Sequence, residues 1–246
     1  EVVLDVVYNH TAEGGVGGKT YNFKAMGENI FYTKDKENNF INFSGCGNTL
    51  NCNHKVVKDM IIQSLLYWYL EVGVDGFRFD LAPVLGRDSN SQWARHSLLH
   101  ELIEHPILSH AKLIAESWDL GGYFVGAMPS GWCEWNGAYR DTVRQFIRGD
   151  FGQVTELIKR IFGSVDIFHA NKNGYQSSIN FICCHDGFTM WDLVSYNSKH
   201  NLLNGENNQD GENNNHSYNH GEEGLTHNLQ ILSLRKQQIK NMLLIL

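Results

Sequence analysis

The sequence has no long apolar run, few positive charges and no paired-cysteine motif. No apolar run approaches the roughly 18 residues of a membrane-spanning helix, so we expect no membrane segment. Basic residues number 20 against 27 acidic ones, and this net charge of -7 disfavours nucleic acid or an anionic membrane surface as the main partner. The five cysteines form no CxxC pattern, which favours the reduced thiols of an intracellular protein and gives no support to a zinc site. A bridge between Cys46 and Cys52 stays an alternative.

The composition is that of a globular chain. With 246 residues, of which 42% are hydrophobic and 12% aromatic, it has enough apolar surface for a large core and is not a disordered chain. Both ends are apolar, at Val2–Val7 and Met242–Leu246, whereas natural domain ends are usually polar. We therefore expect an internal piece of a longer protein, with no information on a targeting peptide.

Short apolar runs alternate with helical patterns along most of the chain. The apolar runs predict strands at 2–7, 74–79, 112–115 and 178–183. Apolar residues at helical spacing predict helices over 54–72, 93–105, 140–148, 153–162 and 226–240. Strands that alternate with helices indicate an α/β fold with a parallel sheet.

Two long stretches do not fit this alternation. Residues 14–53 and 197–224 are polar and rich in Gly and Asn, and structureless stretches of this length are usually functional loops. The acidic and asparagine residues of the second stretch suggest a calcium loop, but with Gly211 at the turn the position of the bidentate Glu is taken by Ser217. We therefore interpret it as a loop on the substrate side.

Four of the apolar runs end in polar, ionisable residues. VVLDVVYNH ends at His10, VDGFRFD ends at Asp80, KLIAESWD contains Glu116, and INFICCHD ends with His185 and Asp186. Polar groups at the carboxyl ends of successive parallel strands form the active site of a (β/α)₈ barrel. The pattern therefore predicts one site built from several strands.

The carboxylates Asp80, Glu116 and Asp186 suit glycoside hydrolysis, which uses one carboxylate as nucleophile and one carboxylic acid as proton donor. Arg78 and Asp80 point the same way in a strand, so the guanidinium keeps Asp80 ionised. Glu116 follows apolar residues, an environment that favours the protonated carboxyl. Taken singly, an Asp at a strand end is more often a helix cap. Four matching strand ends on one chain favour the catalytic interpretation.

These strand ends carry a resemblance to a known family. DVVYNH (5–10), GFRFD (76–80), IAESWD (114–119) and HD (185–186) resemble the four conserved regions of the α-amylase superfamily of glycoside hydrolases. Longer stretches are similar to isoamylase-type debranching enzymes, including plant and bacterial glycogen-debranching members: FSGCGNTLNCNH (43–54), GWCEWNGAYRD (131–141), HDGFTMWDLVSYNSKHN (185–201) and NGENNQDGENNNHS (204–217). The likeness covers nearly the whole chain.

The resemblance implies a role for each matching residue. Asp80 would be the nucleophile, Glu116 the general acid/base and Asp186 the stabiliser of the transition state. The residues implied to line the subsite of the reacting sugar are His10, Arg78 and His185. Asp5 and Asn9 would support this site, and Trp118 and Asp119 would contact the branch. The sequence departs from the family at Ser117, where Pro is usual, and at Cys183–Cys184, which puts the subsite geometry in doubt rather than the chemistry.

The resemblance also implies an incomplete (β/α)₈ TIM barrel, running from about strand three to the start of strand eight. Residues 1–246 would be a partial catalytic domain, without strands one and two, an N-terminal β-sandwich or a C-terminal β-domain. Residues 131–136 would form the sixth strand, and residues 242–246 would enter the eighth.

The activity that the resemblance implies is retaining hydrolysis of α-1,6 branch linkages in glycogen or starch-like glucan. It implies no cofactor and no metal, and a branched α-glucan as partner. A homo-oligomer, or a hetero-oligomer with isoamylase-type subunits, is an alternative to a single chain. The compartment would be the plastid or the bacterial cytoplasm. Two rival hypotheses stay open, an α-1,4-acting amylase or transglycosylase and a non-catalytic glucan-binding regulatory subunit.

Overall fold

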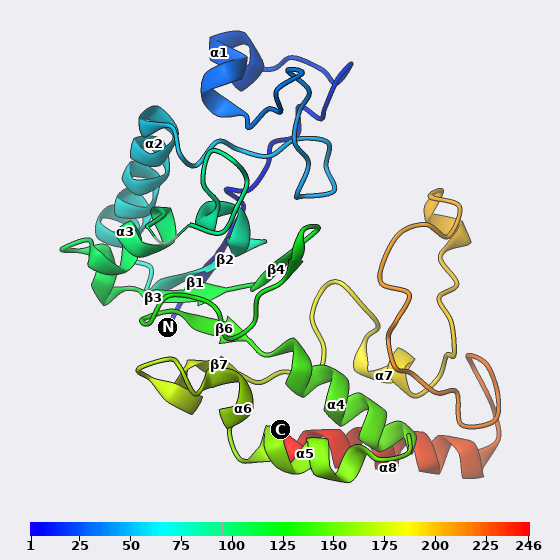
Figure 1. The fold of residues 1–246 in the computed structure, drawn as a ribbon. Coiled ribbons are helices and arrows are strands. Elements are labelled where there is room, and N and C mark those ends of the chain that lie inside the picture. The colour runs from blue at the N-terminus through cyan, green and yellow to red at the C-terminus, as the bar shows by residue number, and fades with distance from the viewer. Residues whose placement is uncertain (95) are drawn as a thin grey trace. The chain divides into compact units, whose positions relative to one another are not determined.

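The computed structural model describes residues 1–94 and 96–246 (Figure 1). Contacts within the chain divide it into two compact units. The first unit consists of Glu1–Trp135 and Ile167–Ser177, and the second consists of Asn136–Asp166 and Ser178–Leu246. Within the described residues, every helix is too short or too polar to cross a membrane.

The first unit is built on a parallel sheet. Its strands are β1 (Val3–Val6), β2 (Gly76–Phe79), β3 (Lys112–Ala115) and β6 (Cys133–Trp135), which are neighbours in that order, as Figure 1 shows. All three pairings are parallel. The predicted strands and the parallel sheet are therefore confirmed in this unit. The order agrees with consecutive strands of a barrel, but the sheet is open and no closed barrel is formed by the described strands.

Helices cover this sheet where the apolar spacing predicts them. Helix α2 spans Lys55–Leu66 and continues as a π-helical turn over Tyr67–Val72, which ends at Gly73 in the left-handed conformation with φ of 81°. Helix α3 spans only Leu98–Glu104, so the prediction of a helix from residue 93 is wrong at its start. The reason is the turn before it, in which Arg87 and Trp93 form an isolated antiparallel bridge.

Smaller elements complete the first unit. Helix α1 (Phe23–Phe31) lies inside the stretch predicted as a loop, so that prediction is wrong there. The helix forms because the Asn22 side chain caps its first turn and because the rings of Phe23 and Phe31 are in contact. A hairpin joins β4 (Trp118–Asp119) to β5 (Gly122–Tyr123). Short helical turns occur at Ala82–Gly86, Leu108–His110 and Gly174–Ser177. The short helix α6 (Val165–Phe168) begins in the second unit and ends in the first.

The core of the first unit lies between the sheet and its helices. Val57, Ile61 and Leu65 recur every four residues on α2 and are fully buried. They share one cluster with the buried strand residues Phe77 and Phe79. Burying each such side chain contributes about 1.5–3 kcal/mol, so this contact between helix and sheet fixes the strands whose ends carry the polar residues.

The second unit is mostly helical. Its elements are α4 (Gly137–Arg148), α5 (Gln153–Ile161), β7 (Ser178–Ile179), α7 (Met190–Leu193), a turn at Leu202–Asn204 and α8 (Leu229–Ile245). The helices α4, α5 and α8 confirm three predicted helices. Tyr139, Val143 and Met242 belong to its buried cluster.

Two predictions are wrong in the second unit. The strand predicted over 178–183 ends at Ile179, so His185 and Asp186 follow an irregular segment rather than a strand end. The predicted start of an eighth strand at 242–246 is instead the last turn of α8. Leu and Met favour a helix, and burial of Met242 in the cluster with α4 holds the end of α8 in place.

Candidate active site

Arg78 on β2 is the centre of the site in the first unit. Its Nη1 donates to Asp5 Oδ1 at 2.8 Å and to Asp80 Oδ1 at 3.1 Å, while its Nη2 forms an ion pair with Glu116 Oε1 at 2.9 Å. The strands bring these side chains to one face of the sheet. Asp5 is the register partner of Arg78, and Asp80 lies two residues beyond Arg78, where the side chain points the same way. The sequence prediction that Arg78 accompanies Asp80 is confirmed.

The surroundings of Arg78 keep it charged. Burial alone would lower the pKa of its guanidinium, but the carboxylates of Glu116, Asp5 and Asp80 outweigh burial and raise that pKa. The ring of Trp135 on β6 lies 4.2 Å from the guanidinium carbon, which adds a cation–π contact. A permanently charged group at this place stabilises negative charge on all three neighbouring carboxylates.

Asn9 and His10 extend the hydrogen-bond network from the end of β1. Asn9 is fully buried, and its Nδ2 donates to the Asp80 carboxylate at 2.7 Å and to the Asp80 carbonyl at 2.9 Å. With Nδ2 so used, Asn9 Oδ1 accepts from His10 Nδ1 at 2.5 Å. Burial lowers the pKa of His10, against the opposing effect of Asp80. A neutral His10 therefore carries its proton on Nδ1 and leaves Nε2 as an acceptor for a substrate hydroxyl.

Glu116 comes directly after β3 and is 2% exposed. Its Oε2 accepts from the backbone N–H of Leu81 at 2.9 Å, and its other oxygen pairs with Arg78. Leu81 has φ of 41°, in the left-handed region that costs a non-glycine residue about 1–2 kcal/mol. This turn points the backbone N–H of Leu81 toward the carboxyl of Glu116. The guanidinium of Arg78 lies beside Glu116, so the environment of this carboxyl is not the purely apolar one that the sequence suggests.

The hairpin after Glu116 holds the two residues expected to contact the branch. The Asp119 carboxylate is fully buried and is bound by Arg87, whose Nε and Nη2 lie 2.9 and 2.7 Å from its oxygens. Phe43 lies against the same guanidinium, with its ring centre 3.9 Å from the carbon. Asp119 therefore anchors the hairpin, and its carboxylate is not presented to a ligand. Trp118 and Tyr123 form a parallel stack at 5.9 Å and are both partly exposed.

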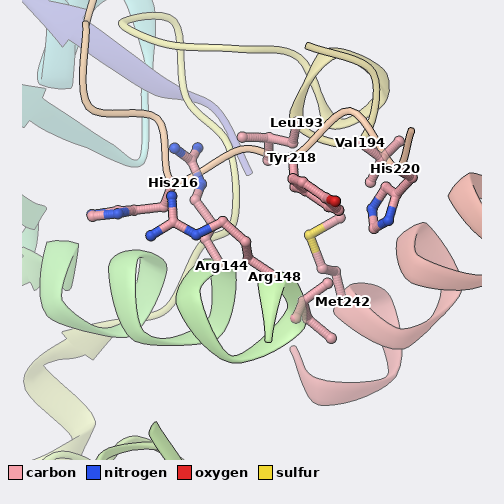
Figure 2. Close-up of a pocket in the computed structure, with 9 residues that line it drawn as sticks. Arg144, Arg148, Leu193, Val194, His216, Tyr218, His220 and Met242 are labelled. Carbon is pink, nitrogen blue, oxygen red and sulfur yellow. The ribbon is translucent and has the colours of Figure 1, made fainter. Parts of the chain in front are cut away.

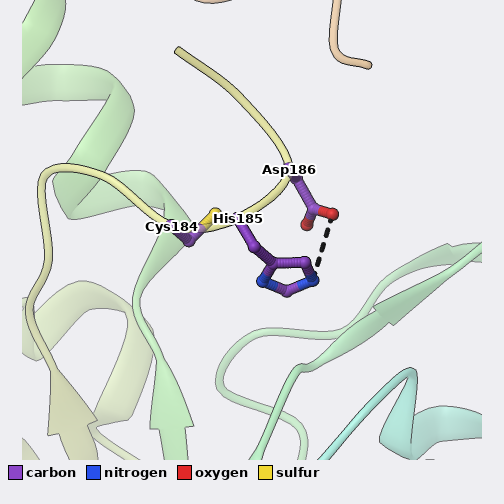
Figure 3. Close-up of side chains that lie close together, drawn as sticks. All are labelled: Cys184, His185 and Asp186. Atoms are coloured by element: carbon purple, nitrogen blue, oxygen red, sulfur yellow. Dashed lines mark ion pairs between the residues drawn. The ribbon is translucent and has the colours of Figure 1, made fainter. Parts of the chain in front are cut away.

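His185 and Asp186 belong to the second unit, and both are exposed (Figure 3). His185 Nε2 lies 3.2 Å from Asp186 Oδ1. Together with Cys184, they offer three ligand atoms within 4.8 Å of one another. Three ligands with adjacent positions in the chain are a weak cation site, and an exposed cluster of this kind is common without an ion.

A small pocket lies in the second unit, lined by α4, α7, α8 and the loop around residues 216–220 (Figure 2). Two arginines give it a cationic wall. Arg144 already donates to the carbonyls of Ile182 and Asn215, and Arg148 is paired with Asp150. These bonds make the pocket part of the framework that holds the 216–220 loop on α4.

Sequence reasoning missed several residues that shape the site. Glu134 on β6 is fully buried, and burial raises its pKa to about 7 although the amides of Gly126 and Met128 and the Ser117 side chain lower it. Its only sequence signal is a carboxylate inside the apolar run WCEW. Trp132 belongs to the core, because it is fully buried and its Nε1 donates to Leu99 O at 3.0 Å.

Fold and site together define a class. A parallel sheet whose carboxyl ends bring a guanidinium, two carboxylates, an amide and an imidazole together has the layout of the (β/α) barrel enzymes, whose sites lie at that end of the strands. The chain is 46% identical over 98% of its length to chloroplastic isoamylase SU1 of Zea mays, and 49% identical over 98% of its length to a glycogen operon protein GlgX homolog of Mycobacterium tuberculosis. It belongs to the isoamylase-type family of the α-amylase superfamily. It spans 34% of the length of each of these curated relatives.

Solved structures agree with this family. Pullulanase from Anoxybacillus sp. LM18-11 is similar with a TM-score of 0.60 and 29% identity, over 77% of this chain and 28% of that chain. The same enzyme complexed with maltotriose gives a TM-score of 0.59 at 28% identity, again over 77% and 28% of the two chains. No model of a known protein family matches the sequence.

Proposed function

We propose that this chain carries the catalytic centre of a retaining glycoside hydrolase that cleaves α-1,6 branch linkages of glycogen or starch-like glucan. The observation that carries the proposal is the shared guanidinium, because Arg78 contacts both Asp80 and Glu116 at the ends of neighbouring strands. Two carboxylates held on one cation are close neighbours, and a retaining mechanism needs carboxyls about 5–5.5 Å apart.

The two carboxylates have different partners and so take different roles. Asp80 is held by Arg78 and Asn9, which align it as the nucleophile that attacks the anomeric carbon. Glu116 protonates the leaving oxygen, and its shared contact with Arg78 then stabilises the carboxylate that it becomes. In the second step Glu116 removes a proton from water, which attacks the glycosyl–Asp80 ester and releases the sugar with its configuration retained.

The remaining site residues act on the sugar ring. His10 has an acceptor nitrogen for a hydroxyl, and His185 and Asp186 keep the roles implied by their motif, Asp186 as the stabiliser of the positive charge that develops at the anomeric centre. The exposed stack of Trp118 and Tyr123 offers an apolar face to a glucose ring next to the acid. Branched α-glucan is the substrate that the names of the relatives support, since they are an isoamylase and a glycogen operon protein.

The test uses the full-length protein with glycogen and amylopectin. We expect Asp80→Asn and Glu116→Gln to lower turnover by several orders of magnitude while the melting temperature changes little, because both lose a reacting group and keep its shape. Asp88→Asn, in an exposed turn of the same unit, is the matched control and should leave turnover unchanged. Near wild-type branch hydrolysis by either active-site variant would refute the assignment.

The products separate the rival activities. Debranching releases longer unbranched chains, so iodine staining should shift to blue, whereas an α-1,4-acting amylase would destroy the colour. A regulatory subunit would leave the colour unchanged. The presence of Asp80, Glu116 and Asp186 disfavours that last alternative, since a non-catalytic relative has no need of all three.

A further inference from the structure

Glu134 lies behind the catalytic face of the sheet. Register places Phe79, Ala115 and Glu134 in one row across β2, β3 and β6. The preceding row, at the level of Arg78, points to the opposite face because side chains alternate along a strand. Glu134 therefore belongs to the reverse side of the strands that carry Arg78 and Glu116, where it is fully buried.

The Glu134 carboxyl binds the segment that follows the general acid. Its Oε2 accepts from the backbone N–H of Gly126 at 2.8 Å, and the Met128 amide and the Ser117 side chain also act on this carboxyl. Glu134 Oε1 and Ser117 Oγ are both buried and make no hydrogen bond of good geometry with a described residue, yet the Ser117 side chain lies near enough to lower the pKa of the carboxyl. Each is therefore the natural partner of the other. The Glu134 carboxyl therefore contacts both ends of the segment from 117 to 128 and restricts its movement.

Serine suits this position because a hydroxyl both donates and accepts. Ser117 accepts from a protonated Glu134 and donates to an ionised one, which the proline usual in this family cannot do. Residues 126–128, which lie around the Glu134 carboxyl, have no titratable side chain. On β6 itself, burial raises the pKa of the Cys133 thiol. Glu116 faces the other side of the sheet. No cation among the described residues is paired with Glu134, and burial raises its pKa to about 7.

We propose that Glu134 is a positioning residue for Glu116, acting through Ser117 and the backbone of Gly126 and Met128. Glu116 and Ser117 are neighbours in the chain, so a side chain that fixes Ser117 on the reverse face fixes the direction of Glu116 toward Arg78. This inference rests on the proposed role of Glu116 as acid/base and adds to it a buried partner on the next strand.

The experiment measures kcat and KM against pH for full-length Glu134→Leu and Glu134→Gln. Leu removes every hydrogen bond, and misplacement of the acid should lower kcat by about 10²-fold with KM changed less than about threefold. Gln keeps an acceptor for Gly126 and a donor for Ser117, so it should restore kcat to within about tenfold of wild type. Wild-type kcat should respond to pH near 7, where Glu134 ionises, and this response should disappear in Glu134→Gln.

Controls separate positioning from simple loss of structure. Glu156→Gln, at an exposed carboxylate of α5, should change neither kcat nor its pH response. Ser117→Ala should lower kcat as well, and combining it with Glu134→Leu should add little, because one contact is lost in both. An unchanged kcat in Glu134→Leu, or a pH response that persists in Glu134→Gln, would overturn the proposal. Activity in Glu116→Gln would instead refute the proposed function itself.

Discussion

At the scale of single residues, burial raises the pKa of two glutamates, but hydrogen bonds reverse the outcome at one of them. Glu134 has amide and hydroxyl neighbours too few to offset burial, and its pKa is raised to about 7. Glu13 is also buried, but it accepts from the backbone N–H groups of Tyr21, Asn22 and Lys24 and from the Tyr32 hydroxyl. These bonds outweigh burial and lower its pKa to about 2. The number of donors decides which carboxyl is ionised.

Glu13→Gln should destabilise the full-length protein by roughly 1–3 kcal/mol at neutral pH, because it replaces several charge-assisted hydrogen bonds. The folded pKa lies below the ordinary value of 4.5, so the stabilisation is present above about pH 4.5 and is lost as the pH falls toward 2. Thermal unfolding across pH 3–7 checks this. The difference in stability between wild type and Glu13→Gln should shrink as the pH is lowered. Glu37→Gln, at an exposed carboxylate, should be as stable as wild type at every pH. A difference for Glu13→Gln that does not change with pH would contradict the role of the charge.

At the scale of elements, the hairpin β4–β5 is held by a buried ion pair rather than by its length. Two residues per strand are too few for a stable hairpin. The pair of Arg87 with Asp119 supplies the anchor, and Trp93 stacks on Phe124 beside it at 5.1 Å. The hairpin follows Glu116 directly, so this anchor also limits the movement of the acid.

Arg87→Met should therefore cost about 3–5 kcal/mol, because it leaves a buried carboxylate without its cation. It should also lower kcat/KM, since the hairpin next to Glu116 loosens. Chemical unfolding and kinetics on the full-length protein measure both effects. Arg87→Met combined with Asp119→Leu should recover part of the stability, and Lys55→Ala, in the exposed pair with Asp59, should change stability by less than about 0.5 kcal/mol. Equal effects of the buried and exposed variants would contradict this account.

At the scale of the whole molecule, sequence patterns predict what is periodic and local. The period of two predicts that Arg78 and Asp80 share a face, and the apolar runs predict β1, β2 and β3, whereas β6 is expected only from the family resemblance. Patterns do not show which distant groups pair. The partnership of Arg87 with Asp119 and that of Glu134 with Ser117 join residues far apart in the chain, and both came only from the structure. The end of α8 was missed because apolar residues such as Met242 and Leu243 suit a buried helix as well as a strand.

The chemistry of the site as a whole makes a further prediction. With both carboxyls on Arg78, the full-length enzyme should release its first product with the α configuration, which then relaxes to the equilibrium mixture. Nuclear magnetic resonance of the anomeric proton within the first turnovers measures this. A branched maltooligosaccharide is the substrate, and spontaneous mutarotation of free maltose is the control. A first product with the β configuration would indicate inversion, and with it a wider separation of Asp80 and Glu116.

The two long polar loops are each held by one ammonium and one carboxylate. Lys24 Nζ donates to the carbonyls of Glu13, Gly15 and Gly18, and Lys199 Nζ donates to those of Gln209, Asp210 and Gly211. The carboxylates of Glu13 and Glu223 accept hydrogen bonds from backbone N–H groups in the same two loops.

Apolar burial weakens on cooling, whereas hydrogen bonds to charged groups do not depend on it. Cooling therefore weakens the apolar contribution to the helix–sheet core, while the hydrogen bonds of Lys24, Lys199, Glu13 and Glu223 in the glycine- and asparagine-rich loops are not weakened in this way.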